Sequence, residues 1–196
     1  MRKGELTRAS ILEHAAGLAS QVGLDGLTIG RLADELTLSK SGLFAHFRSK
    51  EALQVQVLEH AAARFVEVVV KPALAAPRGE PRLRALFDRW RRWPGEGGMA
   101  GGCLFVQASV ELDDQPGPAR ELLVRQQRDW LEVIATVVRT GITEGHFRKD
   151  VDPEQLAFEL HGFMLSWHHA ARLFADPKAE RRAVAAFEAL LARARR

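Results

Sequence analysis

Several residues between Thr28 and Lys50 carry groups that can hydrogen-bond to phosphate oxygens or to the edges of bases. They are hydroxyl, ammonium and imidazole side chains, in the order Thr28, Ser39, Lys40, Ser41, His46 and Lys50. Taken singly, each could be a helix cap or a solvated surface group on any small helical domain. A shared role is favoured by the two short helices that would position them.

The same stretch predicts two short helices joined by a tight turn, with a third helix starting directly afterwards. Thr28, Ser39 and Ser49 lie where N-cap residues are expected, because a side-chain oxygen there satisfies an unpaired amide of the first helical turn. The first helix has an apolar face with the spacing i, i+3, i+4 and i+7, formed by Ile29, Leu32, Ala33 and Leu36.

The second helix directs Leu43 and Phe47 inward and Lys40, Ser41 and His46 outward. This pattern indicates a helix-turn-helix, in which the second helix lies in the major groove of DNA and its first turn approaches the bases. We therefore expect Lys40 to contact a base or a phosphate and His46 to contact a phosphate.

Residues 6–65 resemble the DNA-binding domain of the tetracycline-repressor (TetR) family of bacterial transcription regulators. The resemblance is carried by T-R-A-S-I-L-E-H-A-A-G-L, G-L-D-G-L-T-I-G-R-L-A and S-K-S-G-L-F-A-H-F-R-S-K-E-A-L, with the motif itself at residues 27–46. About a dozen spaced positions agree, which is more specific than one short motif. The motif and the resemblance together place these residues at DNA: Thr28, Ser39, Lys40, Ser41, Gly42, Phe44, His46 and Lys50.

Two positions depart from the family pattern. At Thr37 the family usually has a turn glycine, which takes a left-handed backbone conformation at little cost, so this turn is either strained or built differently. At Phe44 the family often has a tyrosine whose hydroxyl can reach a phosphate. The chain contains no tyrosine, so that contact is absent, although the apolar packing role of Phe44 survives.

Length and composition bound the class of protein. A chain of 196 residues can hold one compact domain or two small ones. No apolar run approaches the ~20 residues of a membrane helix, and the start M-R-K-G-E-L-T-R leads into a charged helix instead of a signal peptide. We expect no membrane contact and a cytoplasmic location. The single cysteine, Cys103, excludes an internal disulfide and cysteine-based zinc spacing.

The net charge of +3 is a weak argument for nucleic acid by itself. The positions of the basic residues are more informative than the net charge. Arg2, Lys3 and Arg8 precede or open the first helix, and Arg48 lies beside Lys50, so all of these could meet a DNA backbone.

Helical patterns continue along the whole chain, and no segment alternates strictly enough to predict a sheet. The first helix should end at Gly23, and a long helix should run from Ser49 to about residue 70, where prolines and glycines break the pattern. Later helices are expected at 81–93, 103–112, 119–145, 154–174 and 177–194, with a glycine-rich link at 94–102. The predicted fold is all-α. Residues 1–50 form a three-helix helix-turn-helix domain, joined by the long helix to a ligand-binding and dimerisation domain at 51–196.

The last two helices carry apolar stripes that could either complete the core of one protomer or pair with a second copy. The family resemblance implies pairing in a four-helix bundle, and a two-fold dimer suits a palindromic operator. We expect a homodimer with these residues at the interface: Phe163, Phe187, Leu190 and Ala194.

All four tryptophans lie beyond residue 89, with many phenylalanines. Most of these rings could be ordinary core. The resemblance implies an effector pocket in this region, and small-molecule sites are mostly apolar with a few polar groups. The candidates for its lining are Trp90, Phe105, Trp130, His161, Met164 and Trp167.

Other chemistry finds little support. His161 and His168 are about two helical turns apart, roughly 10 Å, which is too far to share one metal ion. No phosphate-binding glycine loop, nucleophile elbow or metalloprotease motif is present, so we expect no metal, no cofactor and no enzymatic activity.

The sequence thus predicts a DNA-binding transcription regulator, more specifically a repressor that a small apolar or aromatic ligand releases from a palindromic operator. Two alternatives remain open. The chain could activate transcription or act without a ligand. It could also be a helical small-molecule-binding protein or enzyme that keeps a degenerate DNA-binding domain.

Overall fold

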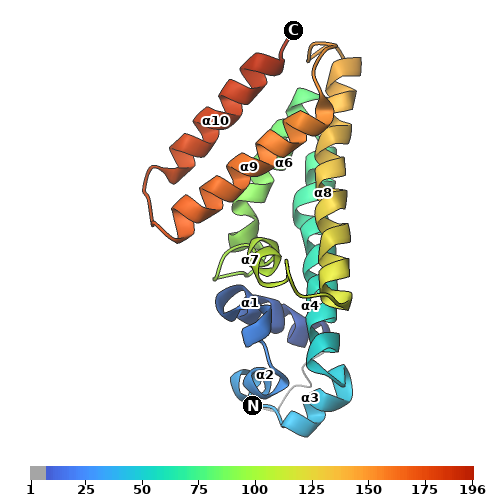
Figure 1. Ribbon diagram of the computed structural model, residues 1–196, viewed down its shortest axis with the longest axis vertical. Helices are drawn as coiled ribbons and strands as arrows, with labels where there is room; N and C mark the ends of the chain where they lie inside the picture. The colour runs from blue at the N-terminus through green and yellow to red at the C-terminus, as the bar shows by residue number, and fades with distance from the viewer. Residues whose placement is uncertain (1–7) are drawn as a thin grey trace. The chain divides into compact units, whose positions relative to one another are not determined.

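The computed structural model describes residues 8–196, and helices dominate this part of the chain (Figure 1). The predicted all-α class is confirmed, and the described residues form no named strand. Arg2 and Lys3, expected near DNA, lie outside the described residues. The elements are α1 Arg8–Gly26, α2 Ile29–Leu36, α3 Lys40–Phe47, α4 Lys50–Phe65, a π-helix Val66–Val70, α5 Lys71–Leu74, α6 Glu80–Glu96, α7 Leu104–Glu111, α8 Pro118–Thr143, α9 Pro153–Arg172 and α10 Ala179–Ala194.

Contacts divide the chain into two compact units. The N-terminal unit comprises the residues up to Val66 together with Pro94–Gln126, and the C-terminal unit comprises Glu67–Trp93 and Gln127–Arg196. Helix α7 packs against α1, and the start of α8 belongs to the same unit. This grouping differs from the predicted division after residue 50. The loop before α7 belongs to the N-terminal unit because its backbone at Gly101 lies against the backbone of α1 at Ser20.

Local sequence signals explain the first helices of the N-terminal unit. The side-chain oxygens of Thr28, Ser39 and Ser49 accept hydrogen bonds from amides in the first turns of α2, α3 and α4, at 3.1, 3.1 and 3.0 Å. All three predicted caps are confirmed. The backbone of α1 leaves helical geometry at Gly23, with φ 78° and ψ 165°, as the predicted stop requires.

Apolar faces of these helices form one core. Leu32, Leu43 and Phe47 are almost fully buried, so α2 and α3 are held by the inward residues that the spacing predicted. Burying a side chain of this size contributes about 1.5–3 kcal/mol. The other buried residues of α1 and α4 include Ile11, Ala15, Ala19, Leu53, Val57 and Leu58.

In the C-terminal unit the helix continues past its predicted end near residue 70. Pro72 has no amide hydrogen to donate to the carbonyl of Val68, four residues earlier. The backbone widens into the π-helix Val66–Val70, and the Val68 carbonyl accepts a hydrogen bond from Arg89 Nη1 at 3.3 Å. The proline therefore alters the hydrogen bonding of the helix without ending it.

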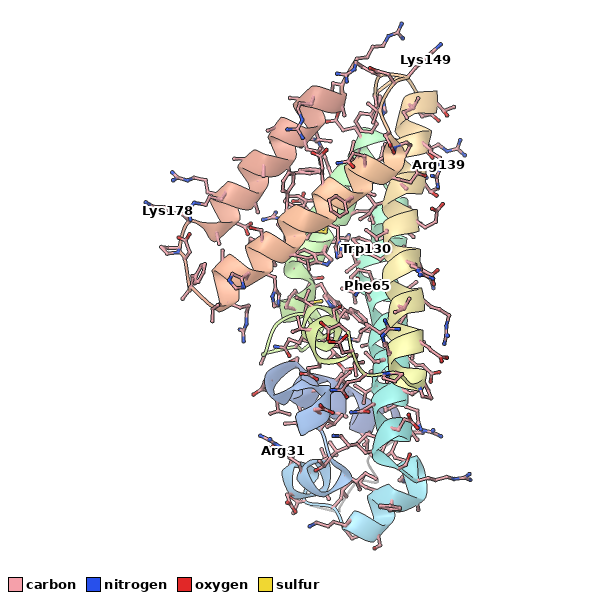
Figure 2. The ribbon with its side chains drawn as sticks, viewed as in Figure 1. Arg31, Phe65, Trp130, Arg139, Lys149 and Lys178 are labelled. Atoms are coloured by element: carbon pink, nitrogen blue, oxygen red, sulfur yellow. The ribbon has the colours of Figure 1, made fainter. Side chains whose placement is uncertain are left out.

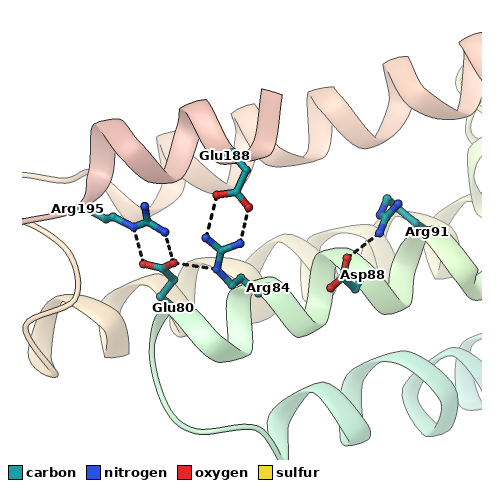
Figure 3. Close-up of polar contacts among 6 residues, drawn as sticks. All are labelled: Glu80, Arg84, Asp88, Arg91, Glu188 and Arg195. Carbon is teal, nitrogen blue, oxygen red and sulfur yellow. Dashed lines mark hydrogen bonds and ion pairs between the residues drawn. The ribbon is translucent and has the colours of Figure 1, made fainter. Parts of the chain in front are cut away.

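Aromatic stacking and ion pairs hold α6 against the C-terminal helices. The rings of Phe87 and Phe187 stack with centroids 4.2 Å apart, within the range that aromatic pairs favour. Beside them, Glu80 binds Arg195 at 2.6 Å and Arg84 binds Glu188 at 2.5 Å (Figure 3). We call this line of contacts the α6–α10 seam.

Candidate nucleic-acid interface

The turn before α3 is built around Thr37, which takes the left-handed conformation with φ 55° and ψ 38°. The amide of Leu38 donates to the carbonyl of Ala33 at 2.9 Å and that of Thr37 donates to Asp34 at 3.3 Å, which is the Schellman pattern. A non-glycine residue in such a conformation costs about 1–3 kcal/mol. Of the two possibilities for this turn, the strained one is therefore observed.

All eight predicted DNA-contact residues are exposed on the N-terminal unit, from the start of α2 to the start of α4. The side chains of Lys40, in α3, and Thr28, the N-cap of α2, both lie near Gly30. A Cβ at Gly30 would lie 3.6 Å from Lys40 Nζ and 3.9 Å from Thr28 Oγ1. The ring of Phe44 is 55% exposed, in keeping with an outward position on α3. Their contacts with DNA stay a prediction.

Lys50 is directed differently from the other predicted residues. Its ammonium binds the carboxylate of Asp25 at 3.2 Å, and the hydrogen bond from Lys50 is the main cause that lowers the pKa of Asp25. The Lys50 side chain is half exposed, so a contact with phosphate would have to be shared with this carboxylate. This ion pair joins the start of α4 to the end of α1.

Sequence reasoning missed two basic features of this surface. Arg31 extends from the exposed side of α2 (Figure 2). A surface cavity of about 380 Å³ lies at the end of α3 and brings together Arg8, His46, Arg48 and Gln56. Arg8 was expected near DNA from its charge alone. Because Arg8 and Arg48 are 40 positions apart, the sequence does not predict that they line the same cavity.

Sequence reasoning also missed the contact between α7 and α1. Glu111 Oε2 accepts hydrogen bonds from the amides of Leu24 at 2.7 Å and Asp25 at 3.2 Å. The carboxylate fits because Gly23 has no side chain: a Cβ there would lie 1.9 Å from Glu111 Oε1. Glu111 thus caps amides that the break in α1 leaves without helical partners.

The loop before α7 fits α1 just as closely. The amide of Gly101 donates to Ser20 Oγ at 3.0 Å, and a Cβ on Gly101 would lie 1.6 Å from the carbonyl oxygen of Ser20. Neither this approach nor the Glu111 contact has a periodic signature. The glycines at 101 and 102 are the only hint in the sequence. We call the two contacts together the α1–α7 clasp.

The predicted ligand-lining residues belong to both units, and each is described within its own. In the N-terminal unit Phe105 packs edge-on against Phe65, with ring centroids 5.9 Å apart. In the C-terminal unit Trp90 packs edge-on against Trp167 at 5.4 Å. The remaining candidates of the C-terminal unit are Trp130, His161 and Met164.

Burial of these candidates is high. Trp90, Trp130, Phe105 and Met164 are at most 7% exposed, and burial lowers the pKa of His161. Such burial fits ordinary core as well as a closed pocket. Their role in ligand binding stays a prediction.

Most of the residues predicted at the dimer interface are buried within a single protomer. Phe187, Leu190 and Ala194 are only 2, 3 and 4% exposed within a single protomer, so the protomer's own core already covers them. The apolar stripe of α10 packs inward. The exposed apolar side chains of α9 and α10 are instead Phe158 at 70%, Leu165 at 39% and Val184 at 37%. Phe163 is partly exposed.

Residues 8–196 contain neither a metal-binding cluster nor a membrane-spanning helix. No group of three or more histidine, cysteine, aspartate or glutamate side chains is placed to hold a metal ion. No helix in this range is long and apolar enough to cross a membrane.

A capped helix-turn-helix with an exposed, basic second helix defines a DNA-binding transcription regulator. Comparison with known proteins gives the family. Residues 11–57 match the bacterial regulatory proteins of the tetR family, and residues 79–187 match the tetracyclin repressor-like C-terminal domain. The chain belongs to the TetR family, which confirms the predicted family and regulatory function.

Individual relatives agree with this assignment. The chain is 26% identical over 151 residues to the HTH-type transcriptional repressor KstR2 of Mycobacterium tuberculosis, covering 74% of this chain and 71% of that one. A TetR regulator from Chloroflexus aurantiacus superposes with a TM-score of 0.82 at 29% identity, covering 98% and 96% of the two chains. AibR, solved with isovaleryl coenzyme A and operator DNA, has a TM-score of 0.67 at 21% identity over 90% and 93%.

Proposed function

We propose that the chain is a cytoplasmic homodimeric repressor that a small apolar or aromatic ligand releases from a palindromic operator. The relative KstR2 is named as a repressor, and AibR holds both an acyl coenzyme A and operator DNA. The cytoplasmic location follows from the need to reach bacterial DNA. A two-fold dimer presents two equivalent recognition helices to the two halves of a palindrome.

The α1–α7 clasp carries the proposal of ligand control. Residues 101 and 111 lie within the region that matches the family's C-terminal domain, yet both bind α1: Gly101 donates to the Ser20 hydroxyl, and Glu111 accepts from amides near the end of the helix. A ligand that favours a displaced α7 would therefore act directly on the helices that hold α3. The shift in DNA affinity equals the difference in ligand affinity between the two states.

On the DNA side, the first turn of α3 enters the major groove. Lys40 contacts a base edge or a nearby phosphate, while Ser41 and the side-chain-free Gly42 allow close approach. Thr28, Ser39 and His46 contact phosphates that fix the position of the protein. The support for these contacts is that all of these residues are exposed and that Lys40 lies near the N-terminus of α2.

The dimer interface uses the exposed apolar residues of α9 and α10 in place of the buried ones. Phe158 and Leu165 are seven residues apart on α9 and lie on one side of it, and Val184 is exposed on α10. A second copy that covers them removes apolar surface from water. Phe158→Glu should dissociate the dimer in sedimentation experiments, while Glu154→Gln, an exposed change on the same helix, should not.

Selection of bound DNA from a random pool tests the regulatory function most directly. Lys40→Ala should weaken binding to the selected site by about 1–3 kcal/mol if the contact is to a base. Lys178→Ala, an exposed lysine in the C-terminal unit (Figure 2), is the matched control and should bind normally. Enrichment of no sequence by the wild-type protein would contradict the proposal.

Ligand control needs a second titration. Aromatic and acyl compounds can be screened by tryptophan emission, and the best binder titrated with and without the selected DNA. A ligand that weakens DNA binding by some factor must itself bind more weakly by the same factor when DNA is present. A tight ligand whose affinity ignores DNA would exclude release by that compound.

A further inference from the structure

Arg48 is the single residue that links α3 to the N-cap of α4, and its backbone is strained. Its φ of 61° and ψ of −38° lie in the left-handed half of the map, where a side chain is unfavourable. The amide of Ser49 donates to the carbonyl of Phe47 at 2.6 Å, which closes a three-residue γ-turn of the rare positive-φ kind. Glycine would adopt this turn without a steric cost.

The neighbours of the turn explain why the chain must bend there. Phe47 is completely buried, and Ser49 caps the first turn of α4 through its hydroxyl. Both flanking residues are therefore fixed, and one residue has to reverse the chain direction between them. The fold requires the conformation but does not require an arginine in it.

The Arg48 side chain lines the basic cavity at the end of α3. The cavity also contains Arg8 and His46, and no carboxylate belongs to its lining. Arg8 is held by a hydrogen bond from Nη2 to Gln56 Oε1. Within residues 8–196 no carboxylate forms an ion pair with Arg48, whereas the nearby Lys50 is paired with Asp25. Among the residues that the structure describes, two guanidinium groups and an imidazole thus share a site without a negative partner.

The cavity is well placed for the DNA backbone. Helix α3 has eight residues, so its axis is about 12 Å long. The major groove is also about 12 Å wide. A helix whose first turn meets the bases in the groove therefore has its other end near the phosphates that border it.

We propose that Arg48, together with Arg8 and His46, binds one phosphate of the DNA backbone. The inference rests on the proposed DNA-binding function. Arginine suits the role because its fork of donors matches phosphate oxygens two at a time. Backbone strain that a glycine would relieve is retained where the side chain has a function.

Replacing Arg48 separates this role from a structural one, because the two predict opposite effects on stability. Arg48→Gly should raise the thermal unfolding midpoint or leave it unchanged, since it relieves the γ-turn. The same variant should bind DNA about tenfold more weakly or worse, because a charge-assisted contact is lost in each protomer. Arg48→Lys keeps the charge and the strain and should recover part of the affinity.

Salt dependence identifies the lost contact as a phosphate. Each phosphate contact contributes about 0.9 to the slope of log K against log salt, so loss from both protomers should reduce the slope by about 2. Selected and random DNA should be weakened alike, because a phosphate contact carries no sequence information. Arg125→Ala on α8 removes an equal charge outside the helix-turn-helix and should change neither affinity nor slope.

The outcomes separate this inference from the proposed function. Wild-type protein that selects no DNA would overturn both. Wild-type protein that binds, with an Arg48→Gly variant of equal affinity and equal salt slope, would overturn the phosphate site alone. An Arg48→Gly variant that unfolds more easily and binds weakly with an unchanged slope would show a structural role and would also overturn it.

Discussion

The α1–α7 clasp and the α6–α10 seam hold helices together by opposite means. In the clasp, every contact involves backbone groups: Gly101 lies against the Ser20 carbonyl and donates to the Ser20 hydroxyl, and one carboxylate oxygen of Glu111 accepts from two amides. In the seam, long charged side chains meet one another, as Arg84 does with Glu188 and Glu80 with Arg195 (Figure 3). The first leaves no room for a methyl group, while the second leaves freedom in several side-chain torsions.

This difference suggests different functions for the two contacts. A backbone fit has few alternative arrangements, so a displacement of α7 is passed to α1 or breaks the contact. Partly exposed ion pairs adjust to displacement and contribute little each. The clasp is suited to transmit a signal to the DNA-binding helices, and the seam is suited to hold the C-terminal unit together.

The largest effect should come from filling the clasp. Gly101→Ala places a Cβ 1.6 Å from the Ser20 carbonyl oxygen, so the loop must move away from α1. We expect a loss of about 2–4 kcal/mol in the free energy of unfolding, measured by urea denaturation. Gly95→Ala near the end of α6 is the control, because a Cβ there meets nothing within 4 Å. Equal stability of both variants would contradict the close fit.

Removing the Glu111 carboxylate should have the next largest effect. Glu111→Ala leaves the amides of Leu24 and Asp25 without this acceptor, and Leu24 is fully buried. An unsatisfied buried donor costs about 1–3 kcal/mol, while Glu111→Gln keeps an acceptor oxygen and should lose less. The exposed Glu121→Ala on α8 should be neutral. Full stability of Glu111→Ala, with unchanged DNA affinity, would remove the clasp from the proposed signalling route.

The seam should instead respond to pH. The hydrogen bond from Arg195 is the main cause that lowers the pKa of Glu80 from 4.5 to about 2. Because the folded pKa lies below the unfolded one, the stabilisation is complete above about pH 5 and is lost as the pH falls toward 2. We expect a contribution of about 1–2 kcal/mol, reduced by the exposure of Arg195.

Glu80→Gln tests this pH dependence by thermal unfolding between pH 3 and pH 7. The wild-type protein should exceed the variant in stability at pH 7, and the difference should shrink as the pH falls. Glu144→Gln is a control in the same unit, because Glu144 lies 3.8 Å from Arg78 at an exposed position. A constant difference between wild type and Glu80→Gln across this range would show that Glu80 does not titrate as proposed.

What the sequence predicted correctly is local. Caps such as Thr28 and Ser39 and the stop at Gly23 depend on residues within one helical turn, so the pattern of residue types determines them. The Glu111 contact spans 87 positions, and no periodicity links a carboxylate to amides that far away. Phe187 shows a third limit. Its spacing predicts burial, but does not say whether its own protomer or a second copy covers it.

The smallest predicted effect concerns backbone strain inside the helix-turn-helix, where a threonine occupies a left-handed position that suits glycine better. Thr37 holds the left-handed position of the turn between α2 and α3 and has the branched Cβ that this conformation disfavours most. Thr37→Gly should stabilise the protein by about 1 kcal/mol in urea denaturation, because relief of strain exceeds the added flexibility of the unfolded chain.

The effect of Thr37→Gly on DNA affinity decides what that strain does. The turn keeps its two hydrogen bonds, to Ala33 and Asp34, in either variant, since both bonds use backbone groups. If the threonine only fills a position where glycine would do, affinity for the selected operator should be unchanged while stability rises. A drop in affinity together with a rise in stability would mean that Thr37 sets the angle of α3 for DNA. A loss of stability would show that the left-handed turn at Thr37 is not the conformation in solution.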